Sequence, residues 1–92
     1  LPHAAGHENK RISEKYKSII RETVIHVDCA MNIVVVNTYP GMANAAAAAI
    51  DGIGNDAMVG SLAGDDTVFV VMRTPEQARE FTDNFHDTLS TH

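Results

Sequence analysis

The sequence predicts an α+β fold, a two-layer sandwich in which helices cover one face of a four-stranded, mostly antiparallel sheet. Short β-branched runs come in two close pairs, and a segment with helical periodicity follows each pair, which gives a ββαββα order. A further helical segment precedes the first pair. Because 92 residues suffice for one modest core, we expect one domain.

The first third of the chain is expected to form a tail, a helix and a hairpin. Residues 1–12 are polar and lack apolar periodicity, which is typical of a linker or flexible tail, so the domain is expected over 13–92. Apolar residues recur at helical spacing from residue 13. The runs TVIHVD and IVVVNTY (Ile33–Tyr39) follow, and the short polar link between them favours an antiparallel hairpin.

An Ala-rich helix is predicted after the hairpin. Pro40-Gly41 ends the second strand, and MANAAAAAIDGIG is helical by propensity. Gly52 and Gly54 are expected to end this helix, as glycines often do at C-termini. The small side chains from Ala45 to Ala49 allow another element to pack closely against the helix.

Two more strands and a final helix complete the predicted fold. AMVGSLA and TVFVVM are the strands, with a Gly-Asp-Asp turn between them. The helix has the clearest start in the chain, because Thr74 is a good N-cap, Pro75 suits the first helical position and Gln77 completes a Thr-x-x-Gln capping box.

Composition excludes several classes of function. The net charge of −5 argues against a chain that grips a phosphate backbone by itself. One cysteine, Cys29, excludes an internal disulfide framework and fits a reducing compartment, so a cytoplasmic location is expected. No apolar run approaches the roughly 20 residues of a membrane span, and no signal peptide is visible. The start at Leu1-Pro2, without methionine, predicts a fragment or a processed product.

The adjacent carboxylates Asp65 and Asp66 are the main candidate site. A solvated hairpin tip is one interpretation, since Gly and Asp are common turn residues. A divalent metal would need more oxygen ligands than two side chains supply. A polymerase with a Gly-Asp-Asp palm hairpin would need several hundred residues. An organic cation, a guanidinium or an amino group, needs nothing that the chain lacks, because charge-assisted hydrogen bonds supply both strength and direction.

The histidines and the cysteine do not form a convincing reactive site. His3 and His7 have a ligand-like spacing, but no third ligand is near. His26 is expected to be a partly buried strand residue, and His86 and His92 are expected to lie on the solvated surface. No local signature supports a nucleophile–base pair that includes Cys29. We therefore expect neither a metal nor an enzyme activity.

The segment from Asn37 to Gln77 resembles the C-terminal domain of the bacterial arginine repressor family. The motifs that carry the resemblance are Pro-Gly before the Ala-rich helix, an Asp near its end, the Gly-Asp-Asp-Thr hairpin and the Arg-Thr-Pro start of the last helix. The resemblance implies a ββαββα domain that forms trimers and hexamers and binds L-arginine between trimers. Operator DNA of arginine metabolism genes would be read by a separate N-terminal winged helix-turn-helix domain, which this sequence lacks.

The same resemblance assigns roles to particular residues. Asp65 matches the aspartate that binds arginine across the trimer interface, and Asp66 matches its neighbour. Asp51 matches an aspartate that contacts the amino acid end of the ligand. Ala63 matches a position that contributes backbone polar atoms, and Ser61 stands where many members have Thr.

Asn44 is a departure from the family pattern, because members usually have Gln at this position. The amide is kept, but its reach is shorter by about 1.5 Å. The sequence thus leaves two alternatives to an arginine-responsive regulator: a structural oligomerisation module without a small ligand, and a sensor of another basic amino acid.

Overall fold

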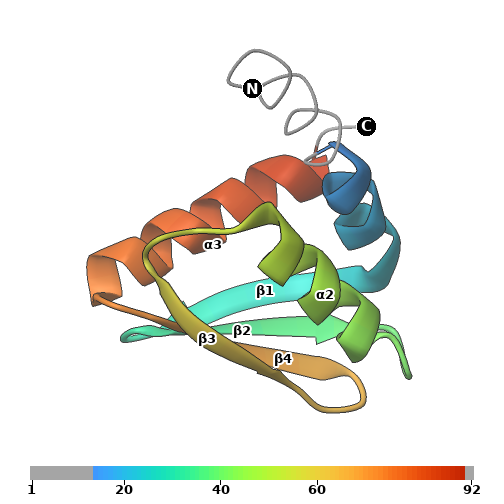
Figure 1. Ribbon diagram of the computed structural model, residues 1–92, viewed down its shortest axis with the longest axis horizontal. Coiled ribbons are helices and arrows are strands. Elements are labelled where there is room, and N and C mark those ends of the chain that lie inside the picture. The colour runs from blue at the N-terminus through green and yellow to red at the C-terminus, as the bar shows by residue number, and fades with distance from the viewer. Residues whose placement is uncertain (1–13, 91–92) are drawn as a thin grey trace, which may run out of the picture.

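The structure, a computed structural model, describes residues 14–90 and confirms the predicted order of elements (Figure 1). A helix over residues 14–23 leads into six further elements: β1 (Val24–Ala30), β2 (Ile33–Thr38), α2 (Ala43–Ile53), β3 (Met58–Ala63), β4 (Thr67–Met72) and α3 (Pro75–Ser90). The expected tail over 1–12, with its two histidines, and His92 lie outside the described residues.

The four strands form one antiparallel sheet in the order β1-β2-β4-β3. The helices lie on one face of this sheet (Figure 1), with α3 packed mainly over β1 and β2, and α2 over β3 and β4. The predicted fold class is therefore confirmed. Since β3 is an edge strand and α2 lies beside it, both elements present side chains along one border of the domain.

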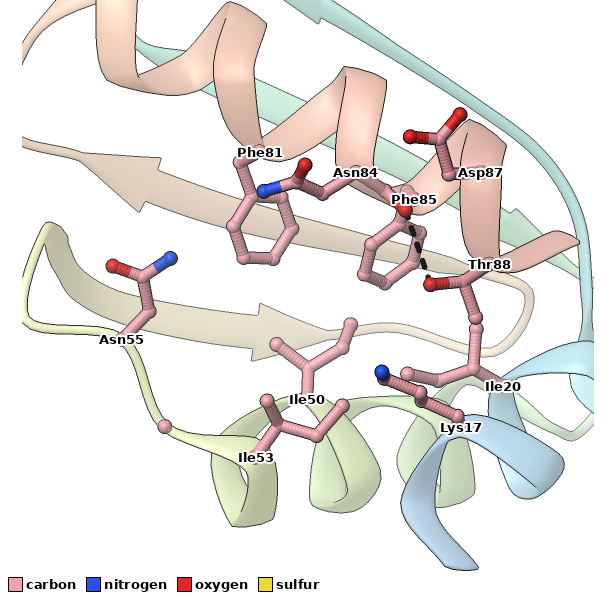
Figure 2. Close-up of a pocket in the computed structure, with 11 residues that line it drawn as sticks. Lys17, Ile20, Ile50, Ile53, Asn55, Phe81, Asn84, Phe85, Asp87 and Thr88 are labelled. Carbon is pink, nitrogen blue, oxygen red and sulfur yellow. Dashed lines mark hydrogen bonds between the residues drawn. The ribbon is translucent and has the colours of Figure 1, made fainter. Parts of the chain in front are cut away.

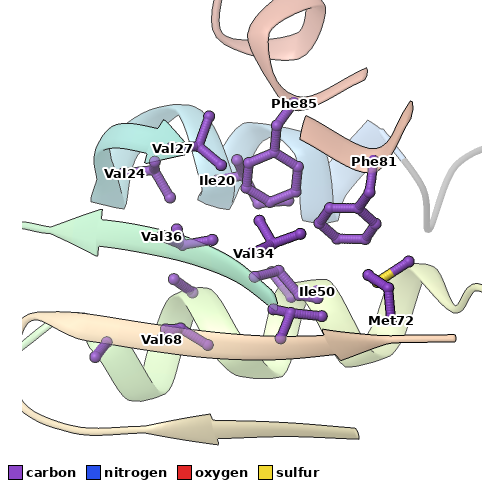
Figure 3. Close-up of a cluster of buried hydrophobic side chains, with 14 of the residues drawn as sticks. Ile20, Val24, Val27, Val34, Val36, Ile50, Val68, Met72, Phe81 and Phe85 are labelled. Atoms are coloured by element: carbon purple, nitrogen blue, oxygen red, sulfur yellow. The ribbon is translucent and has the colours of Figure 1, made fainter. Parts of the chain in front are cut away.

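The core lies between the sheet and the helices (Figure 3) and is built from small and β-branched side chains. Strand alternation places one face of β2 and β4 inside, and the buried alanines of α2 let that helix lie close to the sheet. The aromatic rings of α3 stack at 5.1 Å and cover the other half. The side chains buried most completely are those of Ile20, Val27, Val34, Val36, Val68, Val70 and Met72.

The opposite face of the sheet is not covered by any described helix. Phe69 of β4 pairs with Val35 of β2 on one side and with Leu62 of β3 on the other, so the three side chains form an apolar row across the strands. Leu62 is 75% exposed and Phe69 is 48% exposed. Apolar side chains gathered on one surface are typical of a protein–protein contact. We call these three residues the open sheet face.

The end of α2 differs from the prediction. The helix ends at Ile53, and Gly54 caps it with φ 77° and an N–H that donates to the Ile50 carbonyl at 3.3 Å. Gly52 lies inside the helix instead of ending it. A Cβ there would lie closer than 3.0 Å to ring atoms of Tyr16, so Gly52 is needed for close approach of the N-terminal helix.

The structure of the first hairpin differs from the prediction in two places. β1 continues to Ala30, two residues beyond the predicted run, and turns at Met31-Asn32. His26 is exposed and not partly buried, because a register shift between Val24 and His26 breaks the alternation and turns two successive side chains outward.

The predicted start of α3 is confirmed. The Gln77 N–H donates to the Thr74 hydroxyl oxygen at 3.1 Å, as an N-cap requires, and that hydroxyl donates to the Gln77 side-chain carbonyl at the same distance. This cap fixes where α3 begins after β4.

Candidate functional site

The Gly-Asp-Asp turn connects β3 to β4 and lies at the surface. The Gly64 N–H donates to the Thr67 carbonyl at 2.8 Å, which closes the hairpin. The side chains of Asp65 and Asp66 are both exposed. In a single chain the two carboxylates are therefore hydrated, and their mutual repulsion is weakened by water.

Backbone contacts attach this turn to the start of α2. Asp65 accepts two hydrogen bonds from that segment, one at its carbonyl from the Ala43 N–H at 3.2 Å and one at Oδ2 from the Gly41 N–H at 3.3 Å. The carboxylate thus lies beside the N-terminal end of α2. The Pro-Gly motif has a structural role here, because Gly41 adopts φ 79° in presenting its N–H to Asp65.

Asp66 is attached to the neighbouring strand. Its carbonyl accepts from the Thr38 N–H at 2.8 Å, and its Oδ1 accepts from the Thr67 hydroxyl at 3.1 Å. The side-chain amide of Asn37 donates to that same hydroxyl at 3.3 Å. The position of the acidic turn is consequently set by the ends of β2 and α2 together.

A third carboxylate, that of Asp51, lies on α2. The Ser61 hydroxyl on β3 donates to Asp51 Oδ1 at 3.0 Å, so the edge strand orients a side chain from the last turns of the helix. Asp51 is exposed and Ser61 is half-buried. Sequence reasoning selected both residues, but their direct contact is visible only once the two elements are packed.

Asn44 and Asp51 share one face of α2. They are seven residues apart, which corresponds to about two turns and roughly 10 Å along the helix axis. Asn44 is exposed and directly follows Ala43, whose N–H contacts the acidic turn. Ala63, by contrast, is half-buried at the end of β3 and packs against the core.

We call Asn44, Asp51, Ser61, Asp65 and Asp66 the acidic edge. It is a polar border of the domain with one carboxylate at one end and two at the other. An elongated molecule with a positive group at each end matches this arrangement better than a single ion does. Among residues 14–90, no group of three or more His, Cys, Asp or Glu side chains could hold a metal.

Among the described residues, the four longer side chains of the acidic edge, Asn44, Asp51, Asp65 and Asp66, are all exposed. A cavity of about 420 Å³ lies on the helical side of the molecule, and no residue of the acidic edge lines it. Small ligands are usually buried over most of their surface. The described residues of this chain would leave a ligand at the acidic edge largely exposed.

Comparison with known proteins shows the family. The family model for the arginine repressor C-terminal domain matches residues 20–87, a segment that contains every residue of the acidic edge. The chain belongs to the arginine repressor family. This confirms the resemblance seen in the sequence. The name of the family is that of a repressor, a type of transcription regulator.

Curated arginine repressors are similar to this chain over most of its length. That of Clostridium botulinum is 42% identical over 77 residues, which cover 84% of this chain and 51% of the relative. That of Clostridium acetobutylicum is 48% identical over 73% of this chain and 45% of the relative. That of Heliobacterium modesticaldum is 38% identical over 89% and 54%, respectively. The chain thus spans about half the length of the curated relatives it matches.

No helix in the described part of the chain is both long and apolar enough to cross a membrane.

Proposed function

We propose that this chain is the ligand-sensing and oligomerisation domain of an arginine-responsive regulator of arginine metabolism genes, and that L-arginine binds at the acidic edge where two trimers meet in a hexamer. The observation that carries the proposal is the exposed Asp65 carboxylate, held on the start of α2 in a member of the arginine repressor family.

The two ends of the acidic edge suit the two ends of arginine. Asp65 uses Oδ2 to accept from the Gly41 N–H, which leaves Oδ1 for a guanidinium N–H. Asp51 uses Oδ1 to accept from Ser61, which leaves Oδ2 for an ammonium group. Asn44 adds an amide on the same helix face, and Asp66 adds negative charge beside Asp65.

Assembly provides the enclosure that one chain lacks. When acidic turns of facing trimers approach, like charges oppose the contact, and a bound cation reverses the sign of that interaction. Such an interaction strengthens as water is excluded from the interface. Arginine binding and hexamer formation are then linked, and each favours the other by the same free energy. The open sheet face offers the apolar surface that self-association needs.

Contact with operator DNA belongs, in this proposal, to a separate N-terminal winged helix-turn-helix domain of a longer protein. The net charge of −5 agrees with a sensing role for the present chain. Arginine would increase DNA affinity because a hexamer holds several DNA-binding domains together.

A comparison of three amino acids tests the proposal. Thermal unfolding of the chain is measured with L-arginine, L-lysine and L-citrulline, and calorimetry then gives the dissociation constants. Citrulline is the matched control, because its neutral ureido group has nearly the shape of the guanidinium of arginine without its positive charge. When the free concentration of a ligand is 100 times its dissociation constant, binding stabilises the folded state by about 2.7 kcal/mol.

We expect arginine to raise the melting temperature and citrulline to leave it unchanged. A response to lysine with none to arginine would identify a sensor of another basic amino acid. That result would agree with the side chain of Asn44, which is shorter than the Gln usual in the family. No response to any of the three would identify a structural oligomerisation module and would refute arginine sensing.

A further inference from the structure

The cavity on the helical side lies between the N-terminal helix, α2 and α3 (Figure 2). Its volume of about 420 Å³ is in the range of sites for small molecules. Its floor is apolar and is formed by Ile20, Ile50, Phe81 and Phe85, which are all buried in the core. The cavity is thus a recess in the core surface and is separate from the acidic edge.

Polar groups gather at the mouth of this recess. Lys17 reaches toward it from the N-terminal helix, and Figure 2 shows its ammonium group directed over the apolar floor. The side-chain amides of Asn55 and Asn84 lie at the other end of the mouth. Asp87 is the acidic residue among those that line the cavity, and its carboxylate points away from the phenylalanine rings (Figure 2).

We propose that this cavity binds a second small molecule, one that joins an aromatic or branched apolar group to a carboxylate. The apolar group would be buried against Phe81 and Phe85, which is favourable in proportion to the area removed from water. The carboxylate would accept a hydrogen bond from the Lys17 ammonium. A purely apolar ligand would cover the Lys17 ammonium without pairing it, and a cationic ligand would be repelled by it.

Occupancy of the cavity has a consequence for the N-terminal helix. That helix supplies Lys17 and Ile20, whereas α2 and α3 supply the opposite walls. The ligand would therefore hold the helix against the rest of the domain.

Calorimetry with 2-naphthoate as the probe tests the proposal; this probe is an anion, which the carboxylates of the acidic edge repel. The neutral analogue 2-naphthalenemethanol tests the need for the carboxylate. Lys17→Gln removes the ammonium from the cavity, and Lys15→Gln is the matched control, since Lys15 is exposed on the same helix and does not line the cavity. Ile53→Trp places a bulky ring at the mouth, where Ile53 is 39% exposed.

We expect one naphthoate per chain, binding at least tenfold weaker in Lys17→Gln, unchanged within twofold in Lys15→Gln, and lost in Ile53→Trp. The neutral analogue should bind no better than naphthoate binds to Lys17→Gln. The proposal is overturned if wild-type protein shows no saturable binding at millimolar naphthoate, or if Lys17→Gln binds as well as wild type. It is equally overturned if Leu62→Ser, on the open sheet face, is the change that abolishes binding. None of these results depends on whether arginine itself binds.

Discussion

Replacing Asp65 by asparagine tests the role of the acidic turn with little change in shape. Asparagine keeps an oxygen that can accept from the Gly41 N–H, which lies 3.3 Å from Asp65 Oδ2, and the backbone contact with Ala43 does not involve the side chain. Because Asp65 is exposed, we expect the free energy of unfolding to change by less than about 0.5 kcal/mol. The fold should therefore survive the change.

The effect on arginine affinity should be much larger. A hydrogen bond to a charged group contributes about 1.5–3 kcal/mol, and about 1.4 kcal/mol corresponds to a factor of ten. Loss of the carboxylate charge should thus weaken arginine binding roughly tenfold to a hundredfold, as measured by calorimetry at fixed ionic strength.

Asp56→Asn is the matched control for net charge. Asp56 is exposed before β3, and its backbone carbonyl, not its side chain, accepts from Arg73 at 3.2 Å. Arginine affinity should be unchanged in this variant. Unchanged affinity in Asp65→Asn, or an equal loss in both variants, would refute direct recognition of the guanidinium by Asp65.

Three further changes give separate predictions. Asn44→Gln lengthens the amide toward the ligand and should hold or improve arginine affinity in calorimetry; a large loss would mean that the site is shaped for another molecule. Ser61→Ala removes the donor to Asp51 Oδ1 and should weaken arginine binding about threefold to tenfold, whereas Ser61→Thr should restore it; equal affinities in both variants would contradict the orienting role. Gly52→Ala should lower the free energy of unfolding in a urea titration by about 1–2 kcal/mol, because overlap with the Tyr16 ring outweighs the better helix propensity of alanine. In a Tyr16→Ala background the same change should become stabilising, and a stabilising effect in the wild type would contradict the steric argument.

Local signals predicted most of the fold. The Thr74 cap and the β-branched runs act over a few residues, so they are legible in the sequence and agree with the structure. The prediction that Gly52 ends α2 was wrong because the residue that it contacts, Tyr16, lies 36 residues away in another helix. The prediction that His26 is partly buried was wrong because a β-bulge depends on how two strands pair and not on the composition of one strand.

In the candidate site, too, the features that depend on neighbouring residues were predicted, and the contacts between distant segments were not. The acidic turn was visible as two adjacent carboxylates after a glycine, and the family resemblance pointed to Asp51 and Ser61 individually. Their hydrogen bond, and the attachment of Asp65 to Gly41, result from packing β3 and its turn against α2. Such contacts join segments that are 10 and 24 residues apart, and no local pattern specifies them.

Sedimentation velocity of the wild-type chain, with and without L-arginine, tests most directly whether arginine bridges protomers through their acidic turns. The measurement is repeated with L-citrulline at the same concentration, so that charge is the variable. We predict that arginine alone shifts the population from trimers toward hexamers as its concentration rises through the dissociation constant. A monomer that sediments identically in all three solutions would contradict the account.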